Sequence, residues 1–206
     1  MKTSLLLIIF QFVTLHAFCQ VDTNSINILE SILRKQHPNG TLYYTDRLDS
    51  GFIKRIMESL KRRKFIGGPT SSNTYDTVRL SKKEKKYLDS SLNELYSNFW
   101  QDTLFKNSKR IPVDSMGARI EKQNREFYKN KISDTTQAGS INSIRNQVEN
   151  ANTFQFSPLV YFRSKSIFIF FFVRLCGGTC GVDELSFYKL ENGVYKKWFL
   201  ISGGAF

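Results

Sequence analysis

The chain has 206 residues, of which 41% are hydrophobic and 14% aromatic, and Lys and Arg exceed Asp and Glu by 12. This length suffices for one good hydrophobic core, so a single domain is expected and an array of several domains is excluded. Beyond the N-terminus no stretch resembles a membrane span. The closest, residues 166–176, is too short and too rich in β-branched and aromatic residues.

The N-terminal stretch MKTSLLLIIFQFVTLHAFCQ has the layout of a secretory signal peptide, with a positive residue, an apolar run and a more polar exit. Ala17 and Cys19 are the small residues expected just before a cleavage site. We therefore expect residues 1–19 to be a signal peptide. The mature chain would begin at Gln20 and work in the periplasm or outside the cell.

Two other interpretations of this stretch were weighed against cleavage. A membrane anchor is disfavoured because the apolar run is short for a helix that crosses a bilayer, which needs about 20 residues. A lipid on Cys19 is disfavoured because the large Phe18 precedes it, where lipidation sites have a small residue. Cleavage is the interpretation that fits best.

Cys176 and Cys180 are the cysteines that a chain starting at Gln20 would keep, and an even pair in an exported protein is expected to be oxidised. A zinc site needs two more ligands, and the mature chain has only one histidine, His37. Catalytic dithiols use C-x-x-C at a helix N-terminus, whereas strand-like segments flank this wider pair. We expect a structural disulfide at the mouth of a hairpin.

The positive charge is concentrated in residues 54–110, which contain 14 Lys and Arg against 6 Asp and Glu. In a cytoplasmic protein such an excess would suggest nucleic acid. Behind a signal peptide, nucleic acid is not expected. Two interpretations stay open: the charges belong to solvated helix faces that bind nothing, which is the favoured one, or they bind an anionic component of the cell envelope, either a glycan, a lipid phosphate or an acidic protein.

Helices are expected in the N-terminal half. The first, SINILESILRKQ, ends at the stop formed by His37–Gly40. The second, within LDSGFIKRIMESLKRRKFIGGP, follows a cap at Asp49 or Ser50 and is ended by Gly67-Gly68-Pro69. A weaker helix is expected after Asp114. Two polar stretches are expected to lack a strong pattern: a surface loop at 67–80 and a connector at 133–155.

The strongest helical pattern covers residues 81–100, where Ser81 and Glu84 form a capping box. Its face at helical spacing is expected to be one continuous buried stripe: Tyr87, Leu88, Ser91, Leu92, Leu95, Tyr96, Phe99 and Trp100. Cations are disfavoured at the positive end of the helix dipole, yet four lysines crowd it: Lys82, Lys83, Lys85 and Lys86. These lysines, with the free N–H groups of the first turn, form a candidate anion-binding site.

From residue 154 the pattern changes to strands rich in aromatic and β-branched residues: Val160–Phe162, Ile167–Leu175, Val182–Leu190 and Val194–Ile201. A two-residue turn at Asn192-Gly193 predicts the pairs Phe187–Trp198 and Leu185–Leu200. A hairpin closed by Cys176 and Cys180 predicts the pairs Phe171–Leu185 and Ile169–Phe187. Both registers place these side chains on one face, which helices should cover. The other face is expected to be mixed, and another part of the chain must also cover its aromatic residues.

These patterns predict a single α+β domain over residues 20–206. Its N-terminal helices, at about 20–150, would pack on a C-terminal four-stranded antiparallel β-meander at about 154–203.

The C-terminal part also shows a resemblance, carried by Ser157-Pro158, the aromatic strand Phe168–Phe172, the C-G-x-x-C-G pattern at 176–181 and the hairpin from Lys189 through Gly193 to Tyr195-Lys196. This segment resembles the C-terminal segment of a family of small, uncharacterised exported proteins of Bacteroidota-type bacteria. The ending ISGGAF departs from the Trp-rich ending of that family. The resemblance implies export and an α+β fold, and it implies no activity.

No phosphate loop, dinucleotide fingerprint or calcium loop occurs in the sequence, so no cofactor is expected. The favoured function is therefore a non-catalytic envelope or secreted binding or accessory protein. The alternative function is an enzyme of thiol–disulfide exchange that uses Cys176 and Cys180.

Overall fold

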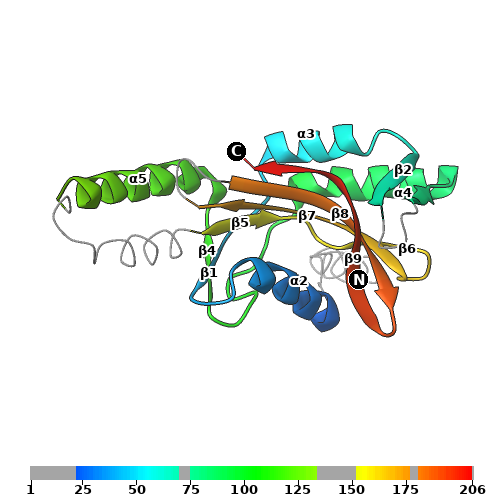
Figure 1. Cartoon of the computed structure of the whole chain (residues 1–206), viewed down its shortest axis with the longest axis horizontal. Coiled ribbons are helices and arrows are strands. Elements are labelled where there is room, and N and C mark those ends of the chain that lie inside the picture. Colours follow the sequence, from blue (N-terminus) through cyan, green and yellow to red (C-terminus); the bar gives the residue numbers. More distant parts are fainter. Residues whose placement is uncertain (1–21, 70–74, 134–151, 177–180, 206) are drawn as a thin grey trace, which may run out of the picture.

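A seven-stranded sheet runs through the molecule, with a two-stranded sheet beside it (Figure 1). The computed structural model describes residues 22–69, 75–133, 152–176 and 181–205. The expected signal peptide and Cys19 lie outside this part of the chain. The elements in chain order are α2 (Thr23–Gln36), β1 (Leu42–Thr45), α3 (Ser50–Ser59), β2 (Lys64–Pro69), β3 (Tyr75–Arg79), α4 (Lys82–Glu94), the 3-10 turn η1 (Leu95–Ser97), β4 (Ser108–Ile111), η2 (Val113–Ser115), α5 (Met116–Ser133), β5 (Thr153–Phe156), β6 (Val160–Phe162), β7 (Ile167–Leu175), β8 (Gly181–Glu191) and β9 (Val194–Ala205).

The large sheet is mixed, with the order β4-β1-β5-β7-β8-β9 and β6 paired to β7 beside β5. β1 runs parallel to both β4 and β5, whereas β5, β7, β8 and β9 follow one another antiparallel. The expected four-stranded antiparallel meander is therefore wrong. Strands β6 to β9 occur where they were expected, but β5, β1 and β4 extend them into a larger sheet. Each of these three strands is 4 residues long, too short for alternation to reveal it in the sequence.

Helices cover both faces of this sheet, with α3 and α4 above it and α2 below it in Figure 1. Side chains cap three of these helices at their starts. Asp22 accepts a hydrogen bond from Ser25 N, Asp49 accepts one from Gly51 N, and Ser81 and Glu84 form the predicted capping box. Among the described residues, no helix has the length and apolarity needed to cross a bilayer.

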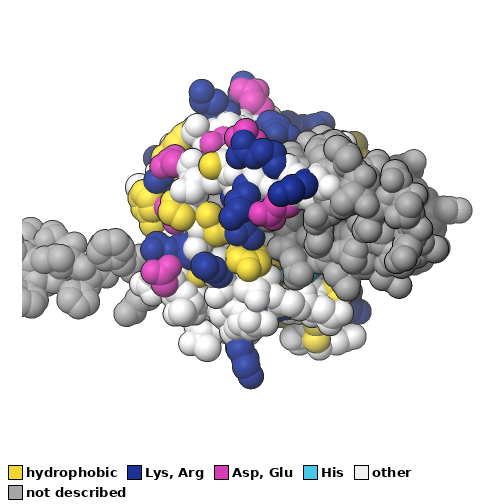
Figure 2. All heavy atoms as spheres, turned by 90° about the vertical axis from the view of Figure 1, so that its left-hand side faces the viewer, with side chains coloured by type: hydrophobic (Ala, Val, Ile, Leu, Met, Phe, Trp, Pro, Cys, Tyr) yellow, Lys and Arg dark blue, Asp and Glu magenta, His cyan; other side chains and the backbone are white. Residues whose placement is uncertain are grey.

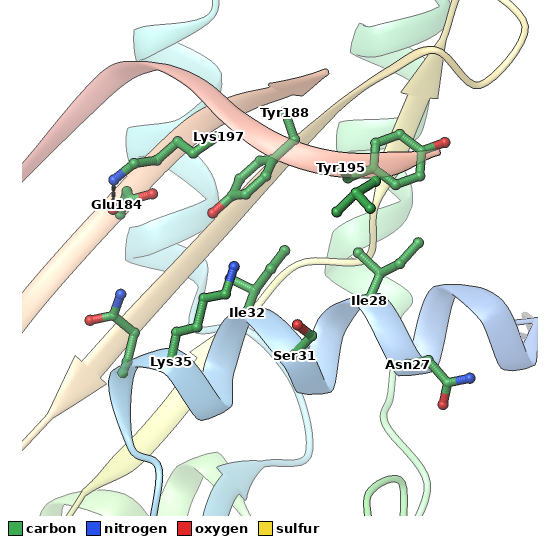
Figure 3. Close-up of a pocket in the computed structure, with 11 residues that line it drawn as sticks. Asn27, Ile28, Ser31, Ile32, Lys35, Glu184, Tyr188, Tyr195 and Lys197 are labelled. Carbon is green, nitrogen blue, oxygen red and sulfur yellow. Dashed lines mark hydrogen bonds and ion pairs between the residues drawn. The ribbon is translucent and has the colours of Figure 1, made fainter. Parts of the chain in front are cut away.

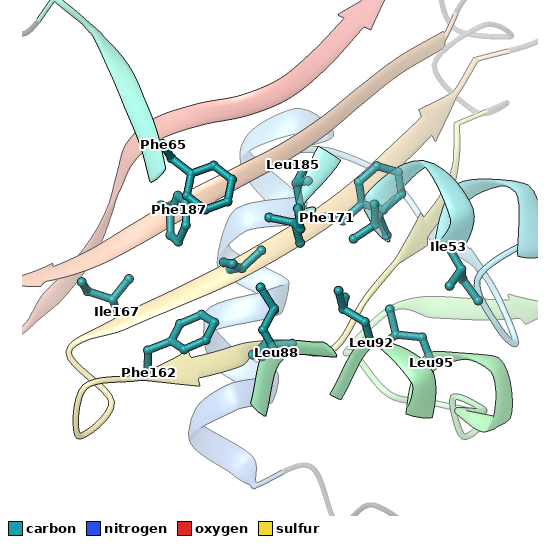
Figure 4. Close-up of a cluster of buried hydrophobic side chains, with 14 of the residues drawn as sticks. Ile53, Phe65, Leu88, Leu92, Leu95, Phe162, Ile167, Phe171, Leu185 and Phe187 are labelled. Carbon is teal, nitrogen blue, oxygen red and sulfur yellow. The ribbon is translucent and has the colours of Figure 1, made fainter. Parts of the chain in front are cut away.

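One core lies between the sheet and the layer of α3, α4 and the β2–β3 hairpin (Figure 4). It contains the side chains predicted to share a face of β7 and β8, which are Ile169, Phe171, Leu185 and Phe187. The continuous stripe predicted for residues 81–100 is wrong in part. Leu88, Leu92 and Leu95 are buried here, but three aromatic residues of that stripe are about half exposed: Tyr87, Tyr96 and Phe99. The α-helix ends at Glu94, so the later residues leave the helical face.

A second core, mostly aromatic, lies on the other face beneath α2. Phe154 and Phe156 of β5 and Phe168, Phe170 and Phe172 of β7 are at most 1% exposed there. Trp100, after η1, completes it by donating from Nε1 to the carbonyl of Phe156 at 3.2 Å. This face was expected to be mixed, with its aromatic part covered by another part of the chain. In the structure, α2 and the segment around Trp100 cover that part.

The predicted β7–β8 register is confirmed, since Phe171 lies opposite Leu185 and Ile169 opposite Phe187. The predicted β8–β9 register holds only near the turn, where Glu191 pairs with Val194. Irregularities after Tyr188 and Ser186 shift it, so Phe187 faces Phe199 and Leu185 faces Ser202. A β-bulge moves the following side chains to the other face. Phe199 is therefore buried, and Leu200 is 51% exposed.

Candidate functional site

The β2–β3 hairpin brings two basic segments together at one end of the molecule. Residues 67–80 were expected to be a loop, but Pro69 and Tyr75 belong to paired antiparallel strands. Phe65 and Val78 face each other and are 3% and 1% exposed, so they bind the hairpin to the sheet. Their neighbours in the strands point outward. Lys64 therefore lies directly opposite Arg79 on the solvent side.

The same pairing places the Lys61–Lys64 run next to the start of α4. Arg63 and Leu80 are joined by two hydrogen bonds, from Leu80 N to Arg63 O at 2.8 Å and from Arg63 Nε to Leu80 O at 3.1 Å. Ser81 follows at once as the N-cap of α4. Basic residues 20 positions apart in the sequence thus share one surface.

The four lysines of the predicted anion-binding site occupy different environments on α4. Lys82, Lys83 and Lys86 are exposed, whereas Lys85 is partly buried and ion-paired with Asp89 one turn later. Three of the four are thus accessible to a ligand on this side, and the fourth has an intramolecular partner.

Glu84 occupies the helix N-terminus that the sequence had suggested for a bound anion. Its carboxylate accepts a hydrogen bond from Ser81 N at 2.7 Å, and its own N–H donates to Ser81 Oγ. The hydrogen bond from Ser81 N lowers the pKa of Glu84 below its usual value, and an ion pair with Arg163 at 3.0 Å acts in the same direction. These amide groups are already used, so an anion would be held by side chains.

We call this surface the basic face: Arg62, Arg63, Lys64, Arg79, Lys82, Lys83 and Lys86. All of these residues are exposed, and none forms an ion pair with another residue of the described part of the chain. The end of the molecule at α5 is different. Figure 2 shows Lys and Arg interspersed with Asp and Glu there, and α5 itself pairs Lys122 with Glu126 and Arg125 with Glu121.

Two apolar side chains lie exposed among these charges. Ile66 is 58% exposed on the same side of β2 as Lys64. Tyr87 is 51% exposed, one helical turn after Lys83, and its ring packs edge-on against Phe162 at 6.1 Å. The basic face is therefore amphipathic rather than purely polar.

The sequence identified the lysines of α4 but missed Arg63, Lys64 and Arg79 as their neighbours. A short alternation could have indicated these neighbours. In residues 64–66 (KFI) and 77–79 (TVR), one inward-facing apolar residue lies between two outward-facing ones. The alternation is only three residues long in each strand. The Gly, Pro and Ser residues around it favoured a loop.

Cys176 directly follows the last residue of β7 and is partly buried. Cys180 lies outside the described residues, so the disulfide stays a prediction. The register of the strands that precede and follow the pair is the expected one, since Leu175 pairs with Gly181.

If this pair is a structural disulfide, the mature protein should contain no free thiol, and reduction should lower its melting temperature without unfolding it at room temperature. A disulfide that closes so short a loop contributes about 2 kcal/mol to the free energy of unfolding. This is a fraction of the 5–15 kcal/mol that is typical of a whole domain. Thiol titration and thermal melts with and without reductant measure both effects. The double variant Cys176→Ser, Cys180→Ser should melt like the reduced protein. Rapid alkylation near neutral pH, with insulin reductase activity lost in the double variant, would instead indicate exchange.

Within residues 22–69, 75–133, 152–176 and 181–205, no group of three or more His, Cys, Asp or Glu side chains could hold a metal ion. His37, expected as part of the stop of the first helix, is the C-cap of α2, where its N–H donates to Leu33 O. No protein-family model matches the chain, and comparisons with curated proteins and with solved structures also find no match.

Proposed function

We propose that this protein is an exported, non-catalytic binding protein that docks through its basic face on a lipid surface of the cell envelope whose phosphate headgroups carry a net negative charge. The observation that carries the proposal is the placement of Lys64 opposite Arg79, beside Lys82 and Lys83, without an acidic partner among the described residues. Like charges directly opposite each other destabilise a pair of strands. An external anion offsets that repulsion.

A lipid surface fits better than a glycan or an acidic protein because of the apolar side chains. Ile66 and Tyr87 are exposed beside the charges, and side chains of this kind enter the boundary between headgroups and acyl chains. Each Lys or Arg near an anionic membrane contributes about 1 kcal/mol. The basic face can therefore hold the protein at such a surface without a membrane-spanning segment.

Sedimentation with lipid vesicles tests this proposal. The mature chain should bind vesicles that contain phosphatidylglycerol and should not bind pure phosphatidylcholine. Added salt should weaken the binding, because the Debye length is about 10 Å at 0.1 M and shorter above it. The triple variant Lys64→Gln, Lys82→Gln, Lys83→Gln should lose affinity roughly 100-fold, from about 1 kcal/mol for each charge.

Two further variants separate this site from net charge. Lys122→Gln, Arg125→Gln, Lys129→Gln removes the same charge from exposed positions on α5 and should bind almost like the unmodified protein. Glu84→Gln, which can still cap the helix, should bind several-fold more tightly. Equal losses in the two triple variants would contradict the proposal. Binding to a sulfated glycan but to no vesicle would assign the face to a glycan.

A further inference from the structure

A second candidate site lies on the opposite face of the sheet, between α2 and the β8–β9 hairpin (Figure 3). It is a cavity of about 440 Å³, within the usual range of 300–1,000 Å³ for sites that hold small molecules. α2 contributes Ile28, Ile32 and Lys35 to its lining, and the hairpin contributes Tyr188 and Tyr195. α3, α4 and the basic face belong to the other side of the sheet.

The aromatic wall of the cavity is held rigidly by its neighbours. Tyr188 is 6% exposed and stacks on Phe168, with ring centroids 4.8 Å apart and planes 10° apart. Tyr195 packs against the same Phe168 at 4.9 Å, and its hydroxyl donates to the carbonyl of Lys165. Because these rings are already packed, an incoming apolar group meets a preformed surface.

The charged groups at the cavity are not balanced. Lys197 is engaged by Glu184 at 3.0 Å, and Glu184 also accepts a hydrogen bond from Ser186 Oγ at 2.8 Å. Lys35, across the cavity on α2, forms no ion pair with any described residue. Figure 3 shows its ammonium group directed into the space between α2 and β8. One positive charge thus remains for a ligand.

A buried phenol lies near this charge. The hydroxyl of Tyr188 points toward the same space in Figure 3. Burial raises the pKa of Tyr188, and the negative charge of Glu184 and a hydrogen bond to its carboxylate raise it further, so the phenol keeps its proton and shares it with Glu184. Lys35 is therefore the group at this cavity that can pair with an oxyanion.

We propose that this cavity binds a small organic anion, whose carboxylate lies against Lys35 and whose flat apolar body lies between Ile32 and the ring of Tyr188. A cation is disfavoured because Lys197 already neutralises Glu184. A neutral apolar molecule would gain nothing from the ammonium group of Lys35, which is exposed and forms no ion pair with a described residue. The proposal does not depend on the docking of the basic face.

Titration of the ¹⁵N-labelled mature chain with phenylacetate, followed by NMR, tests the inference. Phenylacetate should shift the amide resonances of Ser31, Lys35, Tyr188 and Tyr195 in a saturable way. Phenylacetamide, which has the same shape without the charge, should bind roughly tenfold more weakly, as expected for the loss of one charged hydrogen bond. Lys35→Gln should bind the two probes equally.

Lys196→Gln is the matched control, since it removes one positive charge from the residue beside Lys197, outside the cavity lining. It should keep the preference for phenylacetate. The inference is overturned if both probes bind equally to the unmodified protein, if Lys35→Gln keeps the preference, or if no saturable shift occurs at these residues. Shifts confined to the basic face would also overturn it, whereas a failure of vesicle binding would leave it untouched.

Discussion

Replacing Phe156 by alanine should lower the free energy of unfolding by about 3–5 kcal/mol, the usual cost of deleting a buried aromatic side chain. Phe156 is 1% exposed, and its ring lies 4.8 Å from that of Trp100, 5.7 Å from that of Phe105 and 6.0 Å from that of Tyr44. These three rings, from β1 and from the connection between η1 and β4, would lose their common neighbour, and a cavity would be left. Chemical denaturation followed by circular dichroism measures the change.

Phe99→Ala is the matched control, because it deletes the same side chain from a position that is 52% exposed. Its ring contacts the guanidinium of Arg47 at 5.5 Å, an exposed interaction of about 0.5–1 kcal/mol. The expected loss is therefore under about 1 kcal/mol. Similar losses in the two variants would show that the aromatic core beneath α2 is not packed as described.

Ser157→Ala should lower the free energy of unfolding by about 1–3 kcal/mol, although it removes only one oxygen atom. Strand β5 ends at Phe156, and β6 begins at Val160, both on the same side of β7. Ser157 fills the gap between them. Its N–H donates to the carbonyl of Phe171 at 3.0 Å, and its Oγ accepts from the N–H of Phe171 at 3.1 Å. Without the hydroxyl, a buried backbone N–H loses its partner.

The same denaturation experiment on Ser166→Ala provides the control. Ser166 Oγ donates to the carbonyl of Arg163 at an exposed position, where water can replace it. That variant should lose less than about 0.5 kcal/mol. A Ser157→Ala variant as stable as the Ser166→Ala variant would mean that β5 and β6 do not share Phe171 through this serine.

The two hairpins of the C-terminal part differ in how far the sequence could predict them. For β7–β8, the pairing runs without a register shift from Ile167–Lys189 to Leu175–Gly181, so one anchor at Cys176 and Cys180 gave the correct pairs. For β8–β9, the Asn192-Gly193 turn gave the correct pairs only up to Tyr188. The bulges depend on packing in the tertiary structure. Here the ring centroid of Phe199 lies 5.1 Å from that of Phe187, and the Phe199 side chain lies against Gly67. No local pattern records such a contact.

The two candidate sites also differ in how far the sequence could predict them. The lysines of α4 can be identified in the sequence, but the basic face forms because Phe65 and Val78 pack β2 and β3 against the sheet. The cavity could not be predicted at all. It joins Lys35 of α2 to Tyr188 of β8, residues more than 150 positions apart. Only the burial of Phe168 and Phe170 beneath α2 brings them together.

The sequence by itself determined the elements whose partners are close along the chain. The helix caps at Asp49 and Ser81 and the pairing of β7 with β8 depend on residues a few positions apart or on a short turn, so local preference decides them. The tertiary structure alone decided that β1, β4 and β5 join the sheet, because Tyr44 of β1 pairs with Phe154 of β5, some 110 positions later. Strands of four residues are too short to be stable alone and depend on the neighbouring strands and the core that they join, which are properties of the whole fold.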